Sequence, residues 1–110
     1  MSALGEVEEV ISGLIKKEAL NAKIHRDAAG KHFKKATDLY AEAASAYDPD
    51  KGNDETEGDR LTADAQKEEA ARDAERKKAF AEEQRIKGKQ ECLDGIRKKW
   101  VAKQPIPSPR

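Results

Sequence analysis

The sequence is poor in aromatic residues. Only 5% of its 110 residues are aromatic, whereas 40% are charged. A chain of this length allows one domain, and with so few large side chains it has little material for a thick core. Alanine supplies 18 of the 40 apolar residues, and alanine combines the highest helix propensity with little buried area. The composition therefore predicts long helices in shallow contact rather than a globular centre.

The chain also lacks the features of secreted and membrane proteins. Cys92 is the sole cysteine, so no intramolecular disulfide is expected and a reducing compartment is the simpler assumption. The opening segment MSALGEVEEVISGLIKK is acidic where a signal peptide is basic, and no apolar run reaches membrane-spanning length. These absences predict an intracellular, cytoplasmic protein without a transmembrane segment.

Net charge is absent as well, because 22 basic residues balance 22 acidic ones. The balance does not hold locally. Residues 48–59 carry one basic residue against six acidic ones, and residues 85–110 carry eight basic against two acidic. The acidic and basic segments are expected either to meet in the fold or to face different partners.

What the sequence does contain is helical periodicity. Between Val7 and Tyr47 the apolar residues recur at intervals of three and four, and no proline interrupts them before Pro49. This spacing predicts a first helical arm at residues 5–47. A sparser repeat predicts a second arm at residues 60–101.

The two arms are joined by an acidic loop, residues 48–59, which has turn-forming residues and no apolar side chain. Arms of nearly equal length predict an all-α single domain over residues 1–103, folded as an antiparallel helical hairpin with coiled-coil-like packing. If Gly30 and Gly88 break the arms, the expected alternative is a small three- to four-helix bundle. Residues 104–110 are rich in proline and are expected to form a disordered tail.

Small and aromatic residues alternate along the first arm, and a sparse apolar repeat follows in the second. We expect these residues to form an interaction seam between helices. The seam comprises Phe33, Ala36, Tyr40, Ala43, Tyr47, Ile86, Leu93 and Trp100.

Residues 28–49, which contain the phrase KKATDLYAEAASAY, resemble the second helix of a tetratricopeptide unit. They are similar as well to helices of MIT (microtubule-interacting and trafficking) modules and of the soluble NSF attachment proteins. All three families are helical scaffolds that bind peptides or helices. The resemblance implies that this chain binds a helix or peptide too.

No pattern in the chain indicates catalysis or a cofactor. His25 and His32 are seven residues apart, whereas two histidines that bind one metal ion from a helix are normally four apart. The acidic loop departs from the calcium-binding pattern, since Asn53 stands where that pattern needs glycine. We therefore expect no enzyme activity, no cofactor and no metal.

Four basic residues surround Trp100 near the end of the chain, namely Arg97, Lys98, Lys99 and Lys103. One interpretation is that Trp100 anchors the helix end while the bases favour the negative helix terminus. The other is a basic patch that binds phosphates or an anionic surface.

Together these patterns predict a non-catalytic protein–protein interaction or assembly module, an adaptor that binds a helix or peptide and associates with itself. Inhibition of a larger enzyme belongs to the same class, and the sequence does not separate the two. The alternative is a small nucleic-acid or anionic-surface binding protein that acts through the basic segment 85–110.

Overall fold

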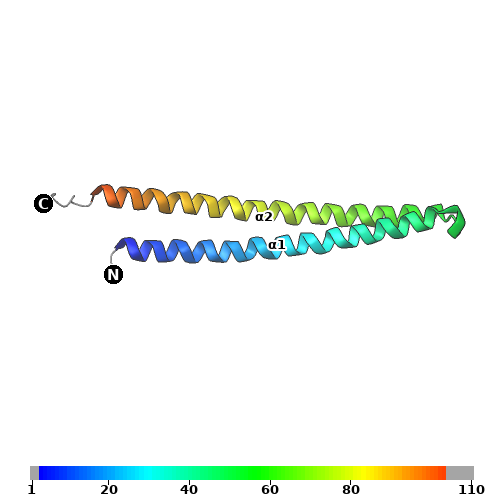
Figure 1. Cartoon of the computed structure of the whole chain (residues 1–110), viewed down its shortest axis with the longest axis horizontal. Helices are drawn as coiled ribbons and strands as arrows, with labels where there is room; N and C mark the ends of the chain where they lie inside the picture. The colour runs from blue at the N-terminus through cyan, green and yellow to red at the C-terminus, as the bar shows by residue number, and fades with distance from the viewer. Residues whose placement is uncertain (1–2, 104–110) are drawn as a thin grey trace.

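The structure, a computed structural model, describes residues 3–103 and the side chains of residues 3–100. It consists of two long antiparallel helices, α1 (Ala3–Tyr47) and α2 (Glu55–Lys103), that pack against each other (Figure 1). The start of α1 and the end of α2 lie at the same end of the molecule. The prediction of an all-α helical hairpin is confirmed.

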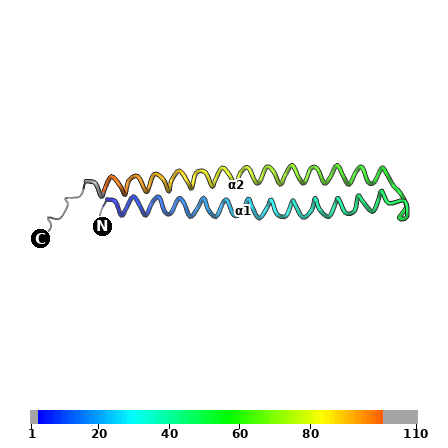
Figure 2. Tube along the Cα trace, turned by 45° about the horizontal axis from the view of Figure 1, so that its top comes forward, coloured from blue at the N-terminus to red at the C-terminus, as the bar shows by residue number. Residues whose placement is uncertain are grey.

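Both arms are continuous within the described residues. Gly30 lies inside α1 and Gly88 lies inside α2, and neither interrupts its helix. The described part of the chain is thus a hairpin, and the three- to four-helix bundle that breaks at these glycines predicted does not form within it. Each helix lies beside the other along its length (Figure 2).

The buried contact between the helices is made mainly of alanine. Buried residues of α1 recur at every seventh position, and those of α2 recur at intervals of four and fourteen. This spacing keeps one side of each helix turned toward the other. The buried seam consists of Ala22, Ala29, Ala36, Ala43, Leu61, Ala65, Ala79 and Leu93.

The register of the hairpin is defined by two contacts across this seam. His25 contacts Glu75 and His32 contacts Glu68, so residues whose numbers add up to about 100 lie level with each other. Ala36 is accordingly level with Ala65, and small residue meets small residue where the two helices face each other.

A short turn reverses the chain. The Asp48 side chain accepts a hydrogen bond from the amide of Asp50 at 2.9 Å, and a single 3₁₀ turn follows at Pro49–Lys51. Gly52 has a φ of 111° and Asn53 one of 44°, both in the left-handed region that these residue types tolerate best.

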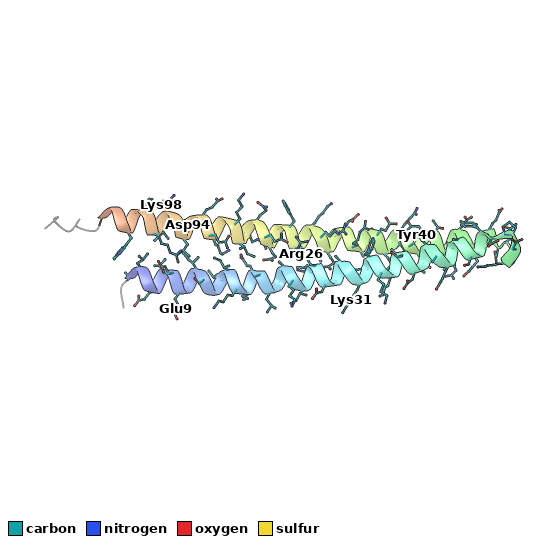
Figure 3. The ribbon with its side chains drawn as sticks, in the orientation of Figure 1. Glu9, Arg26, Lys31, Tyr40, Asp94 and Lys98 are labelled. Atoms are coloured by element: carbon teal, nitrogen blue, oxygen red, sulfur yellow. The ribbon has the colours of Figure 1, made fainter. Side chains whose placement is uncertain are left out.

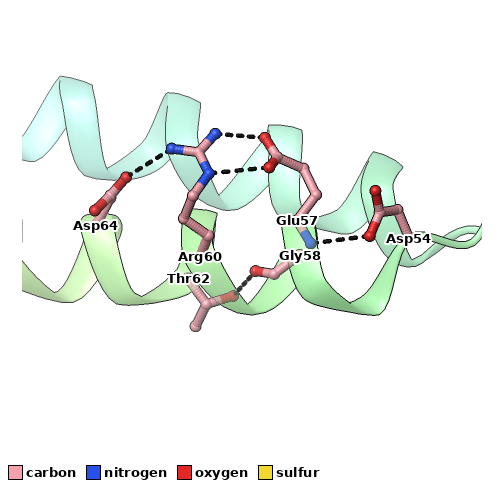
Figure 4. Close-up of polar contacts among 6 residues, drawn as sticks. All are labelled: Asp54, Glu57, Gly58, Arg60, Thr62 and Asp64. Atoms are coloured by element: carbon pink, nitrogen blue, oxygen red, sulfur yellow. Dashed lines mark hydrogen bonds and ion pairs between the residues drawn. The ribbon is translucent and has the colours of Figure 1, made fainter.

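The second helix begins at Glu55, five residues before the predicted arm. The Asp54 carboxylate accepts a hydrogen bond from the amide of Glu57 at 3.0 Å and caps the helix (Figure 4). The Arg60 guanidinium bridges Glu57 and Asp64 on the first turns. The acidic loop is therefore shorter than residues 48–59, because its second half is the capped start of α2.

Gly58 is buried at the turn end of the seam because the Tyr47 ring occupies the place of a side chain. A Cβ atom added at Gly58 would lie 2.5 Å from Cε1 of Tyr47, whereas one added at Gly30 would meet no atom within 4 Å. The packing of the hairpin therefore requires glycine at position 58 but not at position 30.

We predict that Gly58→Ala lowers the free energy of unfolding by about 1–3 kcal/mol, because the added methyl group displaces the Tyr47 ring. Gly30→Ala is the matched control and raises it by about 1 kcal/mol through helix propensity. Urea unfolding followed by circular dichroism measures both. Equal effects of the two substitutions would contradict the packing of Tyr47 on Gly58.

Candidate interaction surface

The interior of the hairpin holds only part of the predicted interaction seam. Ala36, Ala43 and Leu93 are buried, and Ile86 is half-buried. Trp100, 37% exposed, lies at the open end of the hairpin, near the end of α2.

The three aromatic residues of the predicted seam lie at its margin. Phe33 is 50% exposed, and Tyr40 and Tyr47 are exposed as well. Each follows a seam alanine of α1 by four residues, a position that places it on one edge of the helix contact. The alanine seam brings the two backbones close together and leaves no room for a ring between them.

Polar contacts with α2 hold these rings in place, and we call Phe33, Tyr40 and Tyr47 the aromatic flank. The Tyr40 hydroxyl donates to the Glu69 carboxylate where α1 runs alongside α2 (Figure 3), and the Tyr47 hydroxyl donates to Asp59. Each bond to a carboxylate raises the pKa of its tyrosine above 10.

The Arg72 guanidinium lies over the Phe33 ring, 5.5 Å from its centroid. Beside it, residues of both helices line a hollow of about 170 Å³, among them Phe33, Tyr40, Glu69 and Arg72. The aromatic flank is therefore a surface of the hairpin whose polar groups already have partners within it.

Two histidine–glutamate pairs replace apolar contacts inside the seam. Nδ1 of His25 lies 2.5 Å from Oε2 of Glu75, and Nδ1 of His32 lies 2.5 Å from Oε2 of Glu68. All four side chains are half-buried. The hydrogen bond from His25 lowers the pKa of Glu75 below its usual 4.5, and Lys78 acts in the same direction.

These pairs do not form a metal site. His25 and His32 are two helical turns apart, about 10 Å along α1, and each ring contacts its own carboxylate. Within residues 3–100 no three histidine, cysteine, aspartate or glutamate side chains gather in a group that could hold an ion. The spacing of the two histidines alone does not predict their glutamate partners on α2. The signal was available, because Glu68 and Glu75 are also seven residues apart.

The basic end of α2 meets the acidic start of α1. Arg97 Nε lies 3.0 Å from a carboxylate oxygen of Glu8, which raises the pKa of Arg97, and Lys89 Nζ lies 2.6 Å from Glu18. Of the predicted basic patch, Lys98 and Lys99 are exposed, and the side chain of Lys103 lies outside the described residues. The acidic segment 48–59 and the basic segment 85–110 therefore do not meet, because residues 48–59 lie at the turn and the described basic residues lie toward the open end (Figure 1). The basic segment is paired with acidic residues of α1 instead.

Aliphatic side chains of α1 are exposed near the same end. Val10 is 64% exposed, and Val7, Leu14 and Ile24 are exposed too. Val7 and Val10 line a hollow of about 240 Å³ together with Glu6 and Ile11. We call Val7, Val10, Leu14 and Ile24 the aliphatic face. Helical periodicity predicts only that apolar residues recur along this arm, and it does not identify these four as a surface.

Comparisons with protein-family models, with curated proteins and with solved structures find no match to this chain. The resemblance of residues 28–49 to tetratricopeptide-type helices stays a prediction. Neither described helix is long and apolar enough to cross a membrane.

The His25–Glu75 contact predicts a pH dependence of stability. Because the pKa of Glu75 is lower in the folded chain than its usual 4.5, the ionised carboxylate stabilises the fold above about pH 4.5. This contribution is lost as the pH falls through the folded-state pKa. We therefore expect the difference in unfolding free energy between the parent and Glu75→Gln to shrink below about pH 4.5.

Urea unfolding of the two proteins between about pH 3 and 7 measures this difference. Glu91→Gln, at an exposed position of α2, controls for the loss of one negative charge. A difference between parent and Glu75→Gln that stays constant over the whole range would show that the pair does not stabilise the hairpin.

The Tyr40 ring lies at the edge of the seam, so its removal should lower the free energy of unfolding less than the loss of a buried ring does. We predict that Tyr40→Ala lowers the free energy of unfolding by about 1–2 kcal/mol, less than the about 3–5 kcal/mol typical of a large buried ring. Tyr40→Phe keeps the ring and removes only the solvent-exposed bond to Glu69, so we expect it to cost less than Tyr40→Ala. Denaturant titration of both variants checks the order. A loss above about 3 kcal/mol for Tyr40→Ala would place the ring in the interior instead.

Proposed function

We propose that this chain is a non-catalytic assembly module, an adaptor whose surface is completed by a helix or peptide of another protein or by a second copy of itself. One observation carries the proposal. Within the described residues no large side chain is fully buried, while the aliphatic face and the aromatic flank remain exposed. Exposed apolar side chains that gather on one helix are typical of interaction sites.

The size of the exposed surface supports the proposal. The chain exposes 8285 Å², whereas a compact monomer of 12.2 kDa exposes about 6,100 Å². Its radius of gyration is 24.8 Å, against about 13 Å for a compact protein of this length. The excess of about 2,200 Å² exceeds the roughly 800 Å² that each partner buries in a standard interface.

The spacing of the buried residues supports coiled-coil packing between α1 and α2. Buried alanines at every seventh position of α1, opposite a matching repeat on α2, are the pattern of such packing. The half-buried His25–Glu75 and His32–Glu68 pairs sit within the repeat. In the proposal the hairpin is a rigid rod that presents its outer faces to partners.

The alternative, binding of nucleic acid or an anionic surface through residues 85–110, has less support. Arg97 and Lys89 each contact a carboxylate of α1, and Arg85 contacts Glu82 at 2.7 Å. These contacts reduce the positive charge that the segment presents to phosphates, although Lys98 and Lys99 remain exposed.

Light scattering on a size-exclusion column tests the proposal. We expect a mass of twice 12.2 kDa or more, with little change between low and high salt, because apolar contacts carry the assembly. Binding to a nucleic acid that weakens steeply with salt would favour the alternative. A strictly monomeric, cooperatively melting protein at all concentrations would overturn self-assembly.

A further inference from the structure

The aliphatic face shares one side of the hairpin with a row of small residues on α2. Tyr40 and its partner Glu69 each follow a buried alanine by four residues, which defines the side of the aromatic flank. Residues that directly precede a seam position lie on the opposite side. Leu14 on α1 and Cys92 on α2 hold such positions. The row on α2 consists of Ala81, Gly88, Cys92 and Gly95, and Arg85, which directly precedes Ile86, interrupts it.

The hairpin itself gives no reason for the two glycines in this row. A Cβ atom added at Gly88 or at Gly95 would meet no atom within 4 Å. Both lie inside α2, where glycine weakens a helix relative to alanine. Gly58, in contrast, is required by the Tyr47 ring. The glycines of the row leave open space on the outside of the hairpin.

Large and small residues of this side lie at the same level along the molecule. In the register defined by the His–Glu pairs, Val10 is level with residue 90 of α2, and Leu14 is level with Ile86. The valines and leucine of α1 therefore stand beside Gly88 and Cys92 rather than beyond them.

We infer that this side of the hairpin is the contact surface for a second copy of the chain, in a two-fold dimer with α1 of each copy on α2 of the other. This inference rests on the proposed assembly function and specifies its surface. A two-fold axis along the hairpin keeps every residue at its own level and exchanges the helices. It places Val7, Val10 and Leu14 of each copy over Gly88, Cys92 and Gly95 of the other, twice in one interface.

The chemistry of the same side limits the contact to the open end. Toward the turn most residues of this side are charged or small and polar, and a partner would have to desolvate them. On α1 these are Lys31, Lys35, Asp38, Glu42 and Ser45, and on α2 they are Arg60, Asp64 and Lys67, whereas Ala71 and Ala74 are small and apolar. At the open end Glu6 borders the aliphatic face and Lys99 borders the small-residue row, and the basic residues Lys17 and Arg85 share the side with them. A partner copy in the reverse direction, with full overlap, would instead meet the charged half.

The available area fits a dimer. A standard interface buries about 800 Å² on each partner, and the hairpin exposes 8285 Å², about 2,200 Å² more than a compact monomer. Two hairpins joined in this way form a four-helix arrangement over their open halves, in which the side chains of the aliphatic face become interior.

Sedimentation equilibrium of the full chain tests the inference with two opposite substitutions. Val10→Lys puts a charge into the contact, and Gly88→Leu fills the open space at Gly88, where an added Cβ atom meets no atom within 4 Å. We expect each to raise the dimer dissociation constant at least about tenfold. Ser45→Lys, at the same helical position as Val10 but near the turn, leaves it unchanged. Circular dichroism serves as the control that the Gly88→Leu protein keeps the helical content of the parent.

A disulfide reports the arrangement directly. Mild oxidation of Val10→Cys is expected to join the new cysteine to Cys92 of the second copy and give a covalent dimer on a non-reducing gel, whereas Ser45→Cys does not. A dimer insensitive to both Val10→Lys and Gly88→Leu would overturn the inferred surface and leave the assembly proposal standing. A parent chain that stays monomeric at every concentration would overturn the inferred dimer and self-assembly, and would leave only a helix or peptide of another protein as the partner.

Discussion

The structure depends on the close approach of two helices through alanine. Ala36 and Ala65 lie level with each other on the two helices, and both are buried. Such a seam buries little apolar area per residue, so the fold is stabilised by many shallow contacts along a long rod. The same closeness keeps the aromatic rings at the edge of the seam, and among the described residues the large buried side chains are those of Leu61 and Leu93. The exposed rings and aliphatic side chains are therefore a direct consequence of the seam.

A seam of identical small residues resists sliding poorly, because a shift of seven residues again matches alanine with alanine. The polar and leucine positions remove this ambiguity. In the observed register Leu39 is level with Leu61, and the two histidines meet Glu68 and Glu75. A shift in one direction sets His32 against Leu61, and a shift in the other sets Leu39 against Glu68. Each would leave a half-buried polar group opposite an apolar one, which costs free energy.

The sequence predicted the hairpin correctly because periodicity and the turn residues around Pro49 are local signals. The identity of the inner line was harder to predict. The aromatic residues of the first arm repeat every seven residues, and so do the alanines beside them. Either set could therefore have been the one that faces the second helix. Only the matching small residues on α2 decide which line faces inward. The start of α2 was equally ambiguous, because several acidic residues in the loop are suitable caps and only Asp54 is used.

The two halves of the hairpin differ in what their outer sides can do. Near the turn the seam contains Leu39 and Leu61 beside its alanines, and charged side chains cover most of the outside. Near the open end the seam contains Ile15 and Ile86, and α1 carries apolar side chains on its outside too. Two of the interior glycines that the hairpin does not require, Gly88 and Gly95, fall on α2 in this same half, whereas Gly13 and Gly30 lie on α1. Glycine costs about 1 kcal/mol relative to alanine inside a helix, and in the proposed dimer the contact with the second copy offsets this cost at Gly88 and Gly95. In the same proposal the half near the turn is a stable rod that holds the open half in shape.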